Sequence, residues 1–85
     1  MIYATVGSVT TAARLAKKLS AHGDMHTSIV HTPPEINNGG CSYSVRTSVR
    51  DPSLVQEIAA EYGIRIRNFY REDVINGRKF YHVIS

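Results

Sequence analysis

The sequence predicts an α+β domain in which two helices pack on one face of an antiparallel sheet. Three observations predict this class. Several short segments alternate apolar and polar residues, two longer segments repeat apolar residues at helical spacing, and glycine or proline separates them. The length of 85 residues is enough for one small hydrophobic core, so we expect a single domain over residues 1–85.

The first two predicted elements are a strand and a helix. Residues 1–7 alternate, with β-branched and aromatic residues typical of a strand, and Gly7 ends the pattern. Ser8 or Thr10 can then accept a hydrogen bond from the free amides of a following helix. The helix has a narrow apolar stripe and a glycine at its end, at Ala12, Leu15, Ala16, Leu19 and Gly23.

Two more strands follow, on either side of a loop. Residues 24–32 alternate again, and Pro33-Pro34 ends this strand because proline cannot donate a ladder hydrogen bond. Residues 34–40 have the composition of a loop. Residues 41–49 alternate as a third strand.

The last part of the chain predicts a helix and a hairpin. Asp51-Pro52 is a typical helix start, and Gly63 marks its end. Residues 64–70 alternate as a strand. Asn76-Gly77 is the strongest two-residue hairpin signal in the chain and leads into a final strand over residues 79–84.

The resulting order is β-α-β-β-α-β with a C-terminal hairpin strand. Short loops and right-handed crossovers make a ferredoxin-like sandwich the natural assembly of such an order. Two helices would cover one face of the antiparallel sheet. The other face would carry Tyr3 and several arginines, and it is a candidate partner surface.

Composition restricts the function classes. Hydrophobic residues make up 42% and charged residues 20%, with a net charge of +3, which is ordinary for a globular protein. A single cysteine excludes an internal disulfide framework and a multi-cysteine zinc site. The chain has no bilayer-length apolar run, and its first residues do not resemble a signal peptide. We therefore expect a cytoplasmic protein without a membrane partner.

The segment from His31 to Ser42 is the strongest candidate for chemistry, because the only cysteine, Cys41, lies at its exit. Gly39 and Gly40 would leave the thiol uncrowded, and successive amides in such a turn can form a concavity that binds anions. A nearby cation, His31 or Arg46, would favour the thiolate.

Simpler interpretations of the same segment stay open. Free cysteines are often small core residues, so Cys41 could be buried and unreactive. The two glycines could form an ordinary turn, and Pro33-Pro34 could only end a strand. Glu35 could accept a proton near Cys41, although loop glutamates are usually solvated.

The loop and its surroundings resemble the small selenium/sulfur carrier-like protein family. That family has an early tyrosine, a helix with alanines and a leucine, a proline- and isoleucine-containing loop, a glycine-cysteine motif, and an arginine five residues after the cysteine. The matching residues are Tyr3, Ala12, Ala13, Leu19, Pro33, Ile36, Gly40, Cys41 and Arg46. Asn37 replaces a serine and Ser42 replaces a glycine of the family pattern. The resemblance covers roughly residues 1 to 70.

The resemblance implies that Cys41 carries sulfur or selenium as a persulfide or selenenylsulfide. The partners would be sulfur or selenium donor and acceptor proteins, and no cofactor is expected. The site would comprise Cys41 with His31, Pro33, Ile36, Gly39, Gly40 and Arg46. A non-catalytic carrier is favoured over an enzyme, since the chain shows no Ser/His/Asp order, paired carboxylates or phosphate loop.

Three other assignments were weighed. A metal site would need Cys41, His31 and an unidentified third ligand, because His26 and His31 would point to opposite faces of a strand. A nucleic-acid-binding or protein-interaction module would use the sheet face and the basic, aromatic C-terminal hairpin. The carboxylates Glu72 and Asp73 interrupt that basic run, so nucleic acid is the less favoured partner. The last strand is also a candidate edge for a homodimer.

Overall fold

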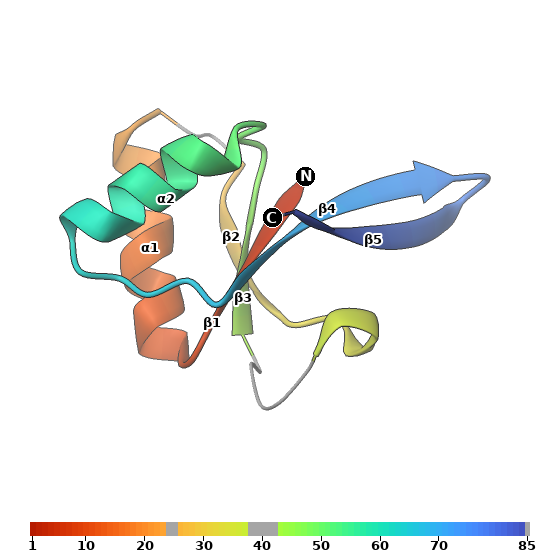
Figure 1. Ribbon diagram of the computed structural model, residues 1–85, viewed down its shortest axis with the longest axis horizontal. Helices are drawn as coiled ribbons and strands as arrows, with labels where there is room; N and C mark the ends of the chain where they lie inside the picture. Colours follow the sequence, from red (N-terminus) through yellow and green to blue (C-terminus); the bar gives the residue numbers. More distant parts are fainter. Residues whose placement is uncertain (24–25, 38–42, 85) are drawn as a thin grey trace.

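The computed structural model describes residues 1–23, 26–37 and 43–84. Its elements are β1 (Ile2–Val6), α1 (Val9–Ala21), β2 (Ser28–His31), the 3-10 turn η1 (Pro34–Ile36), β3 (Tyr43–Thr47), α2 (Pro52–Glu61), β4 (Asn68–Ile75) and β5 (Arg78–Ile84). The strands form one antiparallel sheet in the order β2-β3-β1-β4-β5. The predicted α+β class is confirmed. Strand β5, at the β4 edge, extends the sheet beyond the four strands of a β-α-β-β-α-β sandwich (Figure 1).

Both helices begin where the sequence predicts. The Ser8 hydroxyl accepts a hydrogen bond from the Thr11 amide at 3.1 Å, and the Asp51 carboxylate accepts one from the Ser53 amide at 2.9 Å. These side chains satisfy amides that the first helical turn leaves free. The predicted helix stops are also confirmed, because Gly23 and Gly63 lie just beyond α1 and α2.

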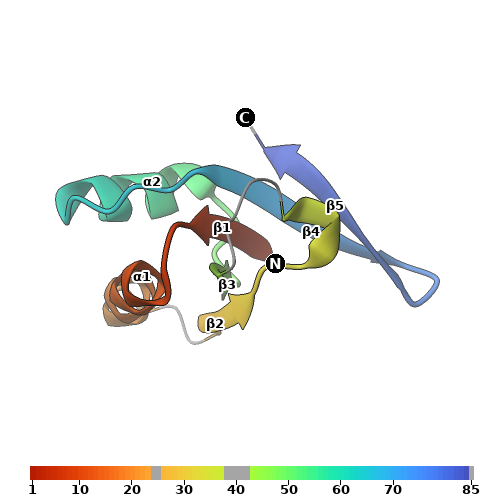
Figure 2. The ribbon, with the colours of Figure 1, turned by 90° about the horizontal axis from the view of Figure 1, so that it is seen from below.

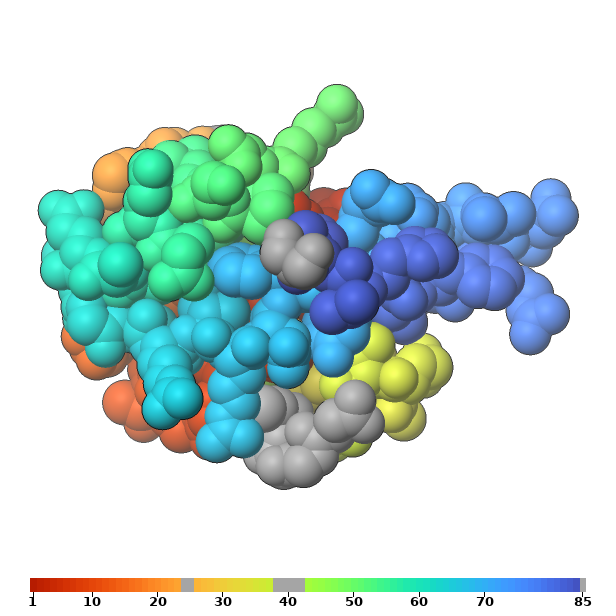
Figure 3. All heavy atoms as spheres, viewed as in Figure 1, coloured from red at the N-terminus to blue at the C-terminus, as the bar shows by residue number. Residues whose placement is uncertain are grey.

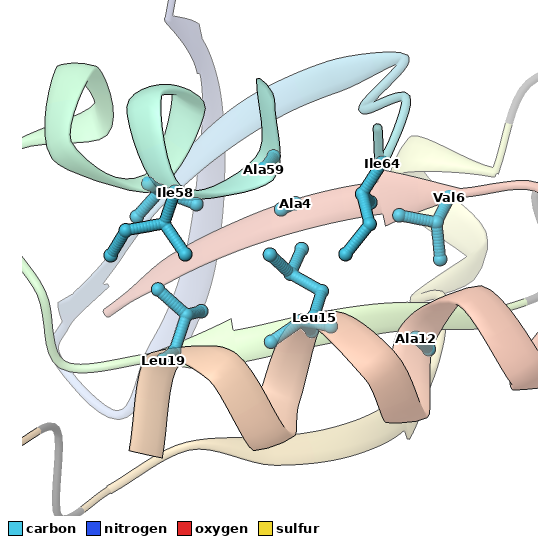
Figure 4. Close-up of a cluster of buried hydrophobic side chains, with 10 residues drawn as sticks. Ala4, Val6, Ala12, Leu15, Leu19, Ile58, Ala59 and Ile64 are labelled. Atoms are coloured by element: carbon cyan, nitrogen blue, oxygen red, sulfur yellow. The ribbon is translucent and has the colours of Figure 1, made fainter. Parts of the chain in front are cut away.

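The main core lies between the helices and one face of the sheet, as Figure 4 shows. Leu15 and Leu19 project from α1 toward Ala4 and Val6 of β1, and α2 adds Ile58 from the other side. Leu15 is fully buried, and burial of such a side chain contributes about 1.5–3 kcal/mol. The helical and strand periodicities of the sequence therefore meet in one aliphatic cluster.

A second, smaller cluster lies on the opposite face of the sheet. Tyr3, Ile36 and Tyr70 are buried there, with Val30 and Tyr81 packed around them. The Tyr3 and Tyr81 rings meet edge to face, with centroids 5.5 Å apart. Figure 2 shows the helices on one side of the sheet and η1 with β5 toward the other. All five residues of β1 are therefore buried.

Strand boundaries differ from the prediction in two places. The strand predicted over residues 64–70 begins too early, because residues 64–67 precede β4. These residues still contact the sheet and its core: Ile64 is buried in the main core, and the Arg67 amide binds the Thr5 carbonyl at 2.9 Å. An extended connection that docks on the core has the same alternation as a strand. Similarly, the strand predicted over 24–32 has its ladder only over Ser28–His31.

The C-terminal hairpin follows the prediction closely. Asn76 and Gly77 both have positive φ, at 52° and 78°. A two-residue turn of this kind matches the right-handed twist of the strands that flank it. The pairing of β4 with β5 runs from Ile75 opposite Arg78 to Phe69 opposite Ile84. Neither helix of the described chain is long and apolar enough to cross a membrane.

Candidate functional site

The sheet face opposite the helices carries a buried carboxylate. Only 3% of the Glu72 side chain is exposed. The Tyr3 hydroxyl donates a hydrogen bond to Glu72 Oε2 at 2.9 Å, and Arg46 Nη2 donates one to Oε1 at 3.2 Å. Lys79 Nζ lies 3.9 Å from Oε2. We call these four residues, Tyr3, Arg46, Glu72 and Lys79, the Glu72 network.

Strand register explains why the Glu72 network assembles. Tyr3 of β1 lies opposite Arg46 of β3 on one side and opposite Tyr70 of β4 on the other. Glu72 is two residues beyond Tyr70, so it projects from the same face. Lys79 is two residues from Tyr81, the partner of Glu72 on β5, and shares that face. Four strands thus each contribute one member.

The network sets the charge states of its members. Burial acts to raise the pKa of Glu72, but the hydrogen bonds from Tyr3 and Arg46 and the charges of Arg46 and Lys79 lower it below its ordinary value. Burial, followed by the hydrogen bond to the Glu72 carboxylate, raises the pKa of Tyr3. At neutral pH the network therefore contains an ionised Glu72 and a protonated Tyr3.

Arg46 is the member of the network with donors to spare. Burial acts to lower the pKa of Arg46, yet its hydrogen bond to Glu72 raises the pKa, so the guanidinium stays charged. Its side chain is 34% exposed, and its carbon Cζ lies 6.0 Å from the centre of the Tyr3 ring. Its Nε atom is buried without a hydrogen-bond partner among the described residues. A guanidinium has five N–H donors, and Glu72 engages only part of this set.

The segment that leads to Cys41 is anchored at both of its ends. The Ile36 amide donates a hydrogen bond to the Pro33 carbonyl at 3.0 Å, which closes η1. The Ile36 side chain is only 5% exposed, because it packs in the cluster with Tyr3. The buried hydroxyls of Thr32 and Ser44 lie 2.7 Å apart. Ile36 therefore docks η1 on the face that holds the Glu72 network.

The predicted centre of the site lies outside the described residues. Gly39, Gly40 and Cys41 fall in the range 38–42, so their predicted roles stay predictions. The described chain continues at Tyr43, the first residue of β3, and Arg46 lies on the same strand. The structure thus brings together Ile36 and Arg46 of the predicted site, on either side of the range that contains Cys41.

His31 does not join Arg46. His31 of β2 lies opposite Tyr43, with ring centroids 5.0 Å apart, whereas Arg46 lies opposite Ser28. Tyr43 and Arg46 are three residues apart on one strand, so they project from opposite faces. His31 and Arg46 therefore lie on opposite faces of the sheet.

Sequence reasoning missed the role of Glu72. Glu72 and Asp73 were interpreted as an interruption of the basic run, and the predicted strand ended at Tyr70. The observed β4 continues to Ile75, and this extension places Glu72 on the Tyr70 side of the sheet. Continued period two beyond Tyr70 is the signal that could have identified it. Among the described residues, no group of three His, Cys, Asp or Glu side chains is placed to hold a metal ion.

Comparison with protein-family models matches a range of the chain that contains all residues of the predicted site. A family model described as "Putative Se/S carrier protein-like" matches residues 1–71. No curated protein and no solved structure matches the chain significantly. The matched range includes Tyr3, Ile36, Cys41 and Arg46, and it ends one residue before Glu72. The chain therefore belongs to the Se/S carrier protein-like family.

Proposed function

We propose that the protein carries sulfur or selenium on Cys41, as a persulfide or selenenylsulfide, between donor and acceptor proteins. The observation that carries this proposal is the family match over residues 1–71, which contains the only cysteine of the chain. A carrier needs one nucleophilic sulfur and no second thiol that could discharge the cargo by forming an intramolecular disulfide. The sequence provides a single candidate sulfur, Cys41, and no second thiol.

The loading step that we propose is a transfer between sulfur atoms. The Cys41 thiolate attacks the outer sulfur of a donor persulfide, the S–S bond of the donor breaks, and the donor leaves as a thiolate. The new S–S bond on Cys41 replaces the broken one, so no external oxidant or reductant is consumed. A donor selenenylsulfide would react in the same way at selenium.

The Glu72 network supports a role for Arg46 in this step. Cys41 precedes Arg46 by five residues, and Glu72 and the Tyr3 ring hold the guanidinium on the face where Ile36 docks the loop. A nearby cation favours thiolate and persulfide anions over their protonated forms. We infer that Arg46 supplies this cation and that Gly39 and Gly40 shape the loop, whereas His31 lies on the other face of the sheet.

We also propose that residues 1–85 form one domain of the ferredoxin-like class, enlarged by β5. Both helices pack in one cluster on one sheet face, and β1 and β3 lie at neighbouring central positions. This arrangement leaves the opposite face to the Glu72 network and to Ile36, so the helices stabilise the fold without covering Arg46.

Mass spectrometry of the intact protein tests the carrier proposal. After incubation with a low-molecular-weight persulfide, the reduced protein should gain the mass of one sulfur atom, and Cys41→Ser should gain none. Serine is nearly isosteric with cysteine, so circular dichroism should show the variant folded. Equal mass gain in Cys41→Ser would contradict the proposal.

The pH dependence of alkylation tests the role of Arg46. Arg46→Gln should move the midpoint of Cys41 alkylation to higher pH, because it removes the cation that favours the thiolate. Arg50→Gln makes the same change at an exposed position outside β3 and should leave the midpoint unchanged. Slow alkylation of the native protein at every pH would instead support the alternative of a buried, unreactive cysteine.

The nucleic-acid alternative loses its main structural support. Base stacking on a sheet needs exposed aromatic rings at its centre. Tyr3 and Tyr70, at the centre of the face opposite the helices, are only 4% and 9% exposed. Because Ile36 and Tyr81 pack against these rings, they offer no stacking platform. The carrier assignment is therefore the one that the site supports best.

A further inference from the structure

The β4–β5 hairpin forms an arm that projects beyond the helices and the rest of the sheet (Figures 1 and 3). Its outer strand, β5 (Arg78–Ile84), lies at the edge of the described sheet and pairs there with β4 alone. An edge strand of seven residues presents backbone N–H and C=O groups to which another strand can pair.

The register identifies which backbone groups of β5 are free. The Glu72 amide binds the Met1 carbonyl at 2.9 Å, so Glu72 directs its backbone toward β1. Its neighbours on β4, Arg71 and Asp73, consequently direct theirs toward His82 and Phe80 of β5. Lys79, Tyr81 and Val83 alternate with these two and therefore direct their backbone groups to the open edge.

The arm also collects exposed apolar side chains. Val74 is 62% exposed, Ile75 55%, Phe80 41% and Val83 67%. Val74 and Val83 project from the face of the Glu72 network, whereas Ile75 and Phe80 project from the other face. The arm therefore offers apolar contacts on both sides of its free edge, as a site for strand addition requires.

The charge of the arm indicates which kind of strand would bind at the β5 edge. Strand β5 carries Arg78, Lys79 and His82 and no carboxylate. The carboxylates of β4 are already engaged, Glu72 in its network and Asp73 with Arg71 at 3.5 Å and with His82 at 3.3 Å. A second copy would bring an equally basic strand to the edge and add repulsion. An acidic segment would add attraction.

We propose that the β5 edge binds an extended segment of a partner protein in which acidic and apolar residues alternate. The segment would add to the sheet as a sixth strand, bonded to the outward backbone groups of Lys79, Tyr81 and Val83. Because its residues alternate, its carboxylates would lie on one face and meet Arg78, and its apolar residues would lie on the other face and cover Val83. Binding at this edge does not require the proposed role of Cys41.

Titration with a synthetic peptide tests the proposal. The probe alternates valine and glutamate over the length of β5, and a valine–lysine peptide of equal length is its control. We expect the valine–glutamate peptide to shift the β5 amide resonances of the full chain in two-dimensional NMR spectra, and the control to leave them in place. Added salt should weaken the binding, because charge steers and stabilises it.

Two variants and one control locate the binding. Arg78→Glu should lower the affinity for the valine–glutamate peptide about tenfold, because it replaces attraction with repulsion. Arg65→Glu makes the same change at an exposed position before β4 and should have little effect on the affinity. Val83→Pro removes an outward N–H and should abolish binding.

Three results would overturn the proposal: equal binding of the lysine peptide, no shift of β5 amides with the glutamate peptide, or a concentration-dependent dimer in sedimentation that Val83→Pro disrupts. The last result would show that a second copy covers the edge.

Discussion

The two faces of the sheet are packed by different kinds of interaction, although β1 supplies side chains to both. Ala4 and Val6 face the helices and lie in a cluster of buried aliphatic residues. Tyr3, which precedes Ala4 in sequence, faces the other way and meets aromatic rings and a buried carboxylate. Two broad helix surfaces seal the first face. Among the described residues, the second is covered by η1 and by side chains of its own strands.

Because of this difference, one face of the sheet mainly stabilises the fold and the other can hold charged groups for chemistry. A face sealed by helices can be entirely apolar, and its burial supplies the dominant favourable term in folding. A face with a thin cover can hold charges near solvent, provided that each is paired, because an unpaired buried charge is costly. The Glu72 network meets that condition and leaves Arg46 partly exposed.

The largest effect should come from the helix-covered face. Leu15→Ala removes a fully buried side chain from the centre of the main core, and we expect it to lower the free energy of unfolding by about 2–5 kcal/mol. Urea denaturation followed by circular dichroism measures this. Leu54→Ala, at a position 41% exposed on α2, is the matched control and should cost much less. Similar losses for both would show that the core is not centred on Leu15.

An intermediate effect should come from the opposite face. Ile36→Ala removes the side chain that docks η1, and we expect a loss of about 2 kcal/mol, at the low end for such truncations because a surface turn can relax into the space. The same variant should change the alkylation rate of Cys41, whereas Leu15→Ala at a temperature where it stays folded should not. A loss as large as that of Leu15→Ala would remove the distinction between the faces.

The smallest effect should be the pH dependence that Glu72 contributes. Its pKa is lower in the folded protein than the ordinary 4.5, so its stabilisation is complete above pH 4.5 and is lost as the pH falls through the folded value. Denaturation of the native protein and of Glu72→Gln at several pH values measures this. We expect the variant to lack a component of about 1.5 kcal/mol, the size of a hydrogen bond to a charged group.

Tyr3 should contribute the opposite pH dependence of stability, at alkaline pH. Its raised pKa means that its stabilisation is present below the ordinary value of 10.0 and is lost as the pH rises through the folded value. Tyr3→Phe should remove this alkaline dependence. Identical profiles for the native protein and both variants would show that the Glu72 network does not couple to folding.

Local signals predicted most of the secondary structure. Ser8 and Asp51 start the helices because their side chains satisfy free amides, and Asn76-Gly77 closes the hairpin because both residues adopt positive φ. Each depends on a few neighbouring residues. The misplaced strand over residues 64–70 has the opposite cause. Whether Ile64 or Phe69 joins a ladder depends on the distant strand β1, which pairs only from Asn68 onward.

The candidate site was predictable in part. Tyr3, Pro33, Ile36 and Arg46 were identified through the family pattern, and three of them, Tyr3, Ile36 and Arg46, lie on one face of the sheet. His31 and Arg46, both predicted to favour the anionic form of Cys41, lie on opposite faces of the sheet, because one residue of register decides the face. The placement of Glu72 required the full length of β4.

By itself, the sequence determined the element order, the helix caps, the hairpin turn and the presence of a single thiol, since each is encoded by residue type over short distances. Only the tertiary structure decided which side chains share a face across four strands. That outcome depends on cross-strand register, which joins residues as far apart as Tyr3 and Glu72. A shift of one residue would reverse the face of every side chain in a strand, so pairing, and not local preference, builds the Glu72 network.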